Sequence, residues 1–258
     1  MSHTFHIPVL GLGYSIDTPL KVARYGISSV VSIVDDQLVE RMREYHSKKE
    51  HGHFIPIPKS APDYREKRIT AYLNMLEETV SQQFEELKNQ EFGMGSDICR
   101  YFELLPESSL LRQGYDLMIE YPEGERKCIF QNILRKQLIK GAIDVNIMSK
   151  VDKMNFNKSG EYTGDENTDA MAALRAFAKS KLQSSVILSA GMNPRLYSYL
   201  ESFKDFFPDE YGTLRKKIIL KVSDFRSAFI QAKFLAKKGL WVSEFRVESG
   251  LNCGGHAF

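Results

Sequence analysis

The sequence predicts an α/β protein whose strands form one parallel sheet. Six short apolar runs are each followed by a glycine-containing loop or by a helical pattern. No short turn of the β-hairpin type joins any two of them, so helical crossovers between parallel strands are expected. Taken alone, this pattern fits both a barrel and a doubly wound sheet. The six expected strands are residues 7–13, 27–34, 142–148, 185–190, 218–222 and 241–247.

Helix start signals follow several of these strands. Thr18-Pro19 combines a capping residue with a proline at a first helical position, and Asp35 or Asp36 is expected to cap the next helix. Further helices are expected at residues 169–181, after Asn193-Pro194, and after Ser223-Asp224. Strand and helix therefore alternate along the chain.

The alternation is interrupted between about residues 47 and 140, a length well beyond an ordinary connection. Apolar residues recur there at helical spacing, so a helical insertion is expected after the second βα unit. It could cover the sheet, close over a pocket or join a partner chain. The expected divisions are residues 1–46 for the first two βα units, 47–140 for the insertion, and 141–258 for units three to six.

Composition indicates an ordinary globular protein. The chain has 258 residues, 43% of them hydrophobic and 26% charged, which is enough for a substantial core. A formal charge of +2 from 35 basic and 33 acidic residues favours neither nucleic acid nor an anionic membrane as a partner. The three cysteines are scattered, the start lacks a secretory pattern, and no apolar run approaches the roughly 20 residues of a membrane span. A cytoplasmic, soluble protein is expected.

The glycine-rich loop at residues 250–256 is the main candidate site. It follows the sixth apolar run and reads Gly250-Leu251-Asn252-Cys253-Gly254-Gly255-His256. Glycines let the backbone approach a ligand closely, and histidine exchanges protons near neutral pH. Cys253 has no evident partner base in the chain order, so a small spacer is a simpler account of it than a nucleophile.

This loop resembles that of the nitronate monooxygenase (2-nitropropane dioxygenase-like) family, which includes FMN-dependent enoyl reductases. The match is Gly250 followed by Cys253-Gly254-Gly255-His256, while Asn252 and Phe258 stand where the family usually has Glu and Gly. The resemblance extends to residues 144–147 and 189–194 and implies a (β/α)8 barrel that binds FMN. It implies His256 as the group that handles a substrate proton. The residues implied to contact the flavin are Gly11, Leu12, Gly13, Asn146, Gly191, Lys221, Gly254 and Gly255.

The number of strands suggests a shortened barrel. A barrel of about 250 residues has eight βα units of roughly 30 residues each, and only six units are found here. Some 60 further residues beyond Phe258 are therefore expected at roughly 30 residues per unit, including loops that commonly hold phosphate. On this interpretation the 258-residue piece alone is expected to be inactive.

Strand alternation predicts polar side chains inside the barrel. Val145 and Ile147 occupy one face of the third strand, so Asn146 is expected to point inward together with Asp144. Lys221 is expected to point inward from the fifth strand, where Glu244, Arg246 and Glu248 could neutralise it. A structural polar layer is an equally good interpretation of Asn146, and an interior charge network is an equally good one of Lys221.

Two functions from different classes remain open. The first is an FMN-dependent oxidoreductase that acts on a small molecule such as a nitronate or an enoyl thioester, with a homo-oligomer as a possible state and with no metal, nucleic acid or membrane involved. The second is a barrel without catalysis that uses the insertion to recruit a partner. His46, His51 and His53 lie in a charged stretch, which is more typical of a solvated loop than of a metal site.

Overall fold

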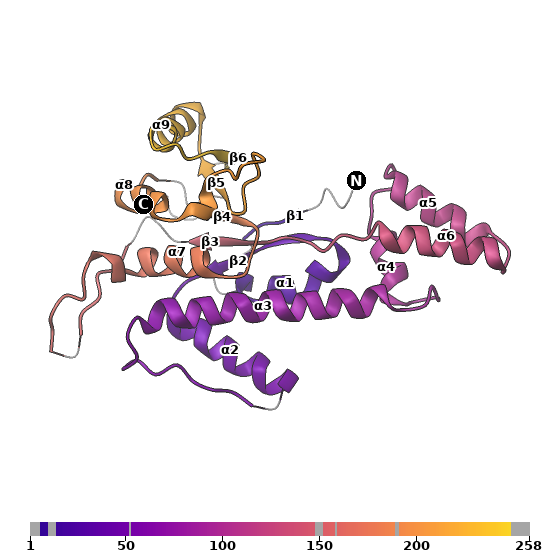
Figure 1. Ribbon diagram of the computed structural model, residues 1–258, viewed down its shortest axis with the longest axis horizontal. Coiled ribbons are helices and arrows are strands. Elements are labelled where there is room, and N and C mark those ends of the chain that lie inside the picture. The colour runs from indigo at the N-terminus through magenta and orange to yellow at the C-terminus, as the bar shows by residue number, and fades with distance from the viewer. Residues whose placement is uncertain are drawn as a thin grey trace.

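The structure, a computed structural model, contains one parallel sheet of six strands (Figure 1). It describes residues 6–9, 14–51, 53–147, 152–157, 159–188 and 191–248. Each strand pairs in parallel with the strand next to it in the sequence, so the order is β1 to β6 without a crossing. The strands are β1 (His6–Ile7), β2 (Ser28–Ile33), β3 (Ile143–Ile147), β4 (Ser185–Leu188), β5 (Lys217–Val222) and β6 (Val242–Val247).

The strand order decides between the two architectures that the sequence left open. A doubly wound sheet reverses its strand order near the middle and carries helices on both faces, whereas this sheet runs in one direction. It is also strongly curved, because side chains of the first and last strands meet: Arg246 Nη1 lies 3.0 Å from His6 Nε2. The sheet is therefore a half-barrel with helices on its convex face, and the prediction of a parallel α/β sheet is confirmed.

Helices α1, α2, α3, α7, α8 and α9 lie between the strands in the sequence and pack on the convex face (Figure 1). Side chains cap several of them as expected: Asp35 Oδ1 accepts from Leu38 N at 2.8 Å, and Asn193 and Asp224 cap α8 and α9. The helices are α1 (Thr18–Val22), α2 (Asp36–His51), α3 (Tyr64–Lys88), α4 (Asp97–Glu103), α5 (Leu110–Glu120), α6 (Glu125–Lys136), α7 (Asp169–Lys179), α8 (Pro194–Tyr199) and α9 (Phe225–Ala236). Short 3₁₀ turns lie at Tyr14–Ile16, Ala23–Tyr25, Asp165–Asn167, Leu200–Ser202 and Lys204–Phe206.

Helix α3 belongs to the core of the half-barrel although it falls inside the expected insertion. Leu73 and Leu76 are fully buried in the same apolar cluster as Val31 and Val145 of the sheet. Their spacing of three residues places these side chains on one helix face. The expected division at residue 47 stays a prediction, but the packing shows that the segment after it contributes directly to the core of the sheet.

Truncation of Leu76 tests this role of α3. Leu76→Ala is expected to lower the free energy of unfolding by about 2–5 kcal/mol, because it removes a fully buried side chain and leaves a cavity. Leu117→Ala on α5 is the matched control, since Leu117 is 55% exposed and its loss is expected to cost less than about 0.5 kcal/mol. Urea denaturation measures the free energy of unfolding of both variants. Equal stability of the two variants would show that α3 is not part of the core.

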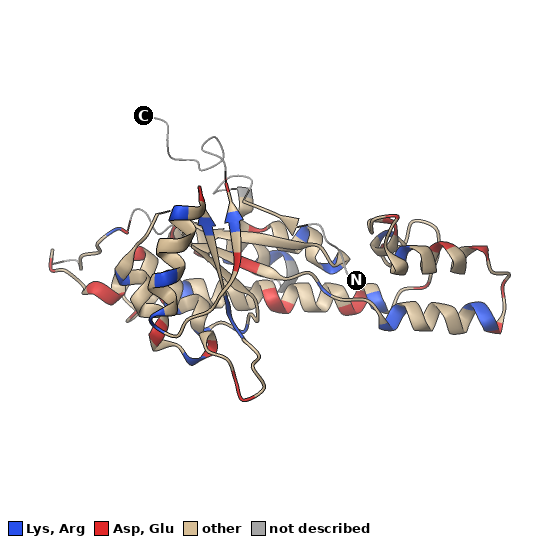
Figure 2. Cartoon of the chain, turned by 90° about the horizontal axis from the view of Figure 1, so that it is seen from above, with Lys and Arg blue, Asp and Glu red and all other residues tan. Residues whose placement is uncertain are grey.

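Helices α4, α5 and α6 form a separate lobe beyond the C-terminal end of α3 (Figures 1 and 2). Its core is a second apolar cluster around Phe102, Tyr115 and Leu134, joined to the half-barrel through Tyr25 and Ile27. The rings of Phe102 and Tyr115 stack with centroids 5.0 Å apart. The lobe also leaves apolar side chains on its surface, among them Leu110, Leu117, Ile129 and Ile133.

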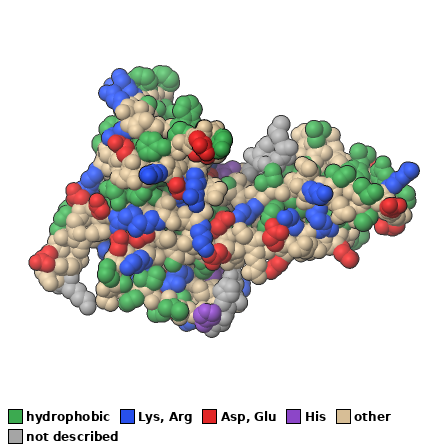
Figure 3. Space-filling view, viewed as in Figure 1, with side chains coloured by type: hydrophobic (Ala, Val, Ile, Leu, Met, Phe, Trp, Pro, Cys, Tyr) green, Lys and Arg blue, Asp and Glu red, His purple; other side chains and the backbone are tan. Residues whose placement is uncertain are grey.

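Strand β6 was expected as an apolar run at residues 241–247, but most of its side chains are exposed. Phe245 and Val247 are 44% and 73% exposed, because β6 forms the edge of the sheet within the described residues. Hydrophobic side chains also gather over α9 at the top of Figure 3, and Phe225, Phe229 and Ile230 of this helix are exposed. Burial of a strand depends on what packs beside it, and alternation within the strand carries no information about that neighbour.

Charges of both signs are interspersed over the molecule (Figure 2). Among the residues that the structure describes, no helix combines the length and the apolar character needed to cross a bilayer.

Buried tyrosines predict a loss of stability in alkali. Burial raises the pKa values of Tyr72 and Tyr197 far above their ordinary value of about 10. The folded chain therefore keeps both phenols neutral, whereas the unfolded chain ionises them above pH 10, so stability is complete below pH 10 and is lost as the pH rises. The slope is about 1.4 kcal/mol per pH unit for each tyrosine.

Denaturation between pH 10.5 and 11.5 measures this slope. The window lies above the range in which Lys216 acts in the opposite direction, since burial lowers the pKa of Lys216 to about 8. Tyr72→Phe loses the hydrogen bond from the Tyr72 hydroxyl to Ile16 O (2.8 Å) and is expected to be less stable at pH 7, but to lose stability less steeply in alkali. An unchanged slope would contradict this role of Tyr72.

Candidate functional site on the concave face

The concave face of the half-barrel carries a polar cluster, defined here as His6, Asp144, Asn146, Lys221 and Arg246 together with their partners Ser32, Glu244 and Glu248. Strand alternation produces it. Ile143, Val145 and Ile147 face the helices, so Asp144 and Asn146 face inward from β3, and the same parity turns Lys221 inward from β5. The inward direction predicted for these three side chains agrees with this packing.

A bulge in β6 keeps its charged side chains on the concave face. Ile218 pairs with Val242 and Ile219 pairs with Glu244, so Ser243 is an extra residue opposite β5. Glu244 and Arg246 consequently share the face of Ile219 and Lys221. Among the described residues, Val30, Ile187 and Ile219, with Val9 beside them, form an apolar patch on this face.

Arg246 joins three strands across the concave face. Its Nη2 atom lies 3.4 Å from Asp144 Oδ2 on β3, and Nη1 donates to His6 Nε2 on β1. Within β6, its Nε atom donates to Glu244 Oε1 at 2.5 Å. Asp144 is further fixed by the backbone N–H of Ser185, which donates to Oδ1 at 3.0 Å. Arg246 thus connects the two edges of the sheet through its interior.

Burial and the neighbouring Arg246 favour the neutral form of His6. Its pKa is lowered first by burial and then by the positive charge of Arg246, while Asp144 and Glu244 raise it to a smaller extent. Since Arg246 can only donate, His6 accepts the bond at Nε2 and carries its proton on Nδ1. His6 was missed in the sequence because the first strand was expected to begin at Ile7.

Asn146 has one satisfied and one unsatisfied polar atom. Its Nδ2 atom donates to Ser32 Oγ at 2.9 Å, and the side chain is almost completely buried. Its Oδ1 atom is buried and accepts no hydrogen bond from any part of the chain that the structure describes. A buried acceptor without a donor costs about 1–3 kcal/mol. Asn146 Oδ1 is therefore placed to accept a hydrogen bond from a ligand.

Lys221 lies near the carboxyl end of β5 and pairs with Glu248, as expected from the sequence. Lys221 Nζ is 2.8 Å from Glu248 Oε1, and both side chains are only partly exposed. The carboxyl ends of barrel strands are where ligands bind in this architecture. Lys221 thus places an ammonium group at the edge where a ligand would enter.

Gly191 follows β4 and has a φ of 124°, a conformation that favours glycine. It provides backbone without a side chain at the carboxyl end of the sheet. The other predicted site residues lie outside the described residues; they are Gly11, Leu12, Gly13, Gly254, Gly255 and His256.

No group of three or more His, Cys, Asp and Glu side chains is placed to hold a metal ion within the described part of the chain. Comparison of the whole sequence with protein-family models and with curated proteins finds no match, and neither does comparison with solved structures.

Proposed function

We propose that the protein is an FMN-dependent oxidoreductase of the nitronate monooxygenase and enoyl-reductase type, built on a (β/α)8 barrel. The observation that carries the proposal is the buried, unsatisfied Oδ1 atom of Asn146 on the concave face of a parallel half-barrel. The flavin ring bears an N–H donor that a carboxamide oxygen can accept. The resemblance of residues 250–256 to the flavin loop of this family supports the same ligand independently of Asn146.

The described residues fit a flavin in three respects. Asn146 offers an acceptor that lacks a donor among the described residues, Lys221 offers an ammonium group that could donate to the ring from beside Glu248, and Gly191 offers backbone at the carboxyl end of β4. When bound, FMN supplies the redox chemistry. The chain itself would orient the ring through these groups, and His256 would give or take a substrate proton.

The substrate class follows from the resemblance alone. We propose a small molecule whose carbon next to an electron-withdrawing group is reactive, such as a nitronate or an enoyl thioester. A cytoplasmic location and a homo-oligomeric state belong to the same proposal.

The visible absorption spectrum of the purified protein tests this function. Protein expressed from its complete gene is expected to carry FMN and to show the two absorption bands of bound flavin, which dithionite bleaches. Protein that is colourless, and that stays colourless after incubation with FMN and desalting, would contradict the proposal.

The alternative, a barrel without catalysis that recruits a partner, is favoured by one observation. The lobe of α4, α5 and α6 leaves Leu110, Leu117, Ile129 and Ile133 between 53% and 82% exposed. Apolar side chains grouped on a surface can mark a site for another protein. A colourless protein together with loss of partner binding in a Leu117→Asp, Ile133→Asp variant would favour this function over the enzyme.

A further inference from the structure

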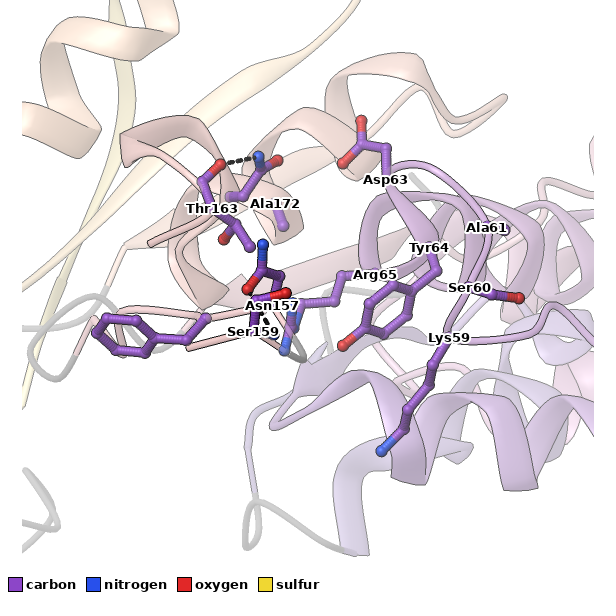
Figure 4. Close-up of a pocket in the computed structure, with 12 residues that line it drawn as sticks. Lys59, Ser60, Ala61, Asp63, Tyr64, Arg65, Asn157, Ser159, Thr163 and Ala172 are labelled. Atoms are coloured by element: carbon purple, nitrogen blue, oxygen red, sulfur yellow. Dashed lines mark hydrogen bonds between the residues drawn. The ribbon is translucent and has the colours of Figure 1, made fainter. Parts of the chain in front are cut away.

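A pocket of about 620 Å³ lies outside the concave face, where the segment that leads into α3 faces the loop between β3 and α7 (Figure 4). Tyr64 and Arg65 extend from the start of α3 toward Asn157 and Ser159 on the facing loop. The volume is within the range of about 300–1,000 Å³ that is usual for small-molecule sites. None of the residues singled out in the sequence lines it.

The pocket is positively charged on balance. Among the described residues, Asp63 is its one acidic lining residue, and the buried Arg175 neutralises it at 2.5 Å. Lys59 lines the pocket, is exposed and has no ion pair with the described residues. Among the described lining residues, the charge of Lys59 therefore remains for a ligand at this rim.

Arg65 adds a second cation whose hydrogen-bonding capacity is mostly unused. Its Nε atom is 3.5 Å from both Asp36 Oδ1 and Asp169 Oδ1, while Asp36 has a closer partner in Arg68 at 2.7 Å. The two cations, Arg65 and Arg68, balance the charge of the two carboxylates, Asp36 and Asp169. Beyond these two 3.5 Å contacts, the Arg65 guanidinium donates no hydrogen bond to the described residues, so its remaining donors can receive an anion.

Aromatic side chains form the apolar part of the pocket. The Tyr64 ring contacts two guanidinium groups, with Arg65 Cζ at 4.7 Å and Arg68 Cζ at 5.2 Å from its centroid. These contacts fix the ring in place. Phe156 lines the pocket from the facing loop and is 56% exposed, so an apolar ligand would cover a ring that now faces water.

The position of the pocket connects it to the carboxyl edge of the sheet. Arg65 also lines a smaller cavity of about 230 Å³ that reaches Ile33 at the end of β2 and Ile147 at the end of β3. The two cavities thus follow one another from the carboxyl ends of the strands outward. Loops at this edge form the binding sites of barrels of this kind.

We infer that the pocket between Tyr64, Arg65 and Phe156 binds a small molecule that carries one anionic group on a planar, apolar body. Lys59 and Arg65 receive the anion, and the rings of Tyr64 and Phe156 cover the planar part. Asn157 and Ser159 supply hydrogen-bonding groups at the opposite wall. This site is distinct from the concave polar cluster and does not depend on the proposed flavin chemistry.

Saturation-transfer NMR with three probes of similar size tests the inference. Phenyl phosphate is expected to bind, whereas the neutral benzyl alcohol and the cationic benzylamine are expected to bind at least about tenfold more weakly, since a charge-assisted bond is lost. Lys59→Gln is expected to weaken phenyl phosphate binding about three- to fivefold. Phe156→Ala is expected to weaken it by about two- to tenfold.

Matched variants control for unspecific effects. Lys59 and Phe156 are both exposed, so their replacement leaves the fold intact, and the controls Lys136→Gln on α6 and Phe225→Ala on α9 change exposed residues of the same types elsewhere. The inference is overturned by equal binding of the three probes or by equal effects of pocket and control variants. Displacement of phenyl phosphate by saturating FMN would also overturn it, because the pocket would then be the flavin site. Binding of the three probes tests the pocket even if the protein binds no FMN, so the outcome is separate from that of the proposed function.

Discussion

Arg246→Met is expected to destabilise the fold by about 2–4 kcal/mol. The variant leaves Asp144 buried on the concave face without its cation, and breaking a buried ion pair costs about 3–5 kcal/mol. The Arg246 side chain is 19% exposed, so water relieves part of that cost. The variant also loses the contacts that join β6 to β1 and β3 across the interior. Equilibrium denaturation in urea measures the difference in the free energy of unfolding between Arg246→Met and the unmodified protein.

A surface ion pair provides the control for this prediction. Arg100→Met on α4 removes a guanidinium that is 55% exposed and 3.9 Å from Asp97, and it is expected to cost less than about 1 kcal/mol. Asp144→Asn combined with Arg246→Met is expected to recover part of the loss, because no unpaired charge remains. If Arg246→Met is no less stable than Arg100→Met, the interior pair does not hold the half-barrel together.

His256→Ala is expected to lower turnover by about 10²- to 10⁴-fold while FMN remains bound. This is the range for the loss of a general acid or base, and the flavin would be held by backbone groups and by other loops. His256 lies outside the described residues, so the prediction rests on the resemblance of residues 250–256. Turnover with a nitronate, together with the flavin content of the purified variant, measures both effects.

The outcome for His256→Ala separates three roles of this residue. A smaller decrease in turnover indicates that it positions the substrate, and loss of FMN indicates that it is a cofactor ligand. Unchanged turnover with bound FMN would remove His256 from the mechanism.

Local patterns in the sequence identified the strands and most of the helices. Short apolar runs rich in β-branched residues predicted β2 to β5 within a few residues, and the alternation in β3 and β5 predicted the direction of Asp144, Asn146 and Lys221. These signals depend only on neighbours along the chain. The Lys221–Glu248 pair was also predictable, because both residues lie near the carboxyl ends of adjacent parallel strands.

Features that depend on distant segments were not predicted. The contact between His6 and Arg246 depends on the curvature of the whole sheet, and the pocket at Tyr64 and Phe156 is formed by segments about 90 residues apart in the sequence. Helix α3 was assigned to an insertion because its apolar stripe gives no sign of what it covers. Burial against a particular neighbour is a property of the tertiary fold, and the pattern of one helix does not contain it.

Titration with FMN, followed by flavin fluorescence, tests the central claim most directly, which is that the concave face binds FMN through Asn146. The protein expressed from its complete gene is expected to bind FMN, and Asn146→Leu is expected to weaken binding by about tenfold or more, because the lost bond is worth about 1–3 kcal/mol. Asn132→Leu, which changes an exposed asparagine on α6, is expected to bind as the unmodified protein does. Circular dichroism confirms that each variant is folded. Equal affinities of the folded Asn146→Leu and Asn132→Leu variants, or no binding by the unmodified protein, would contradict the claim.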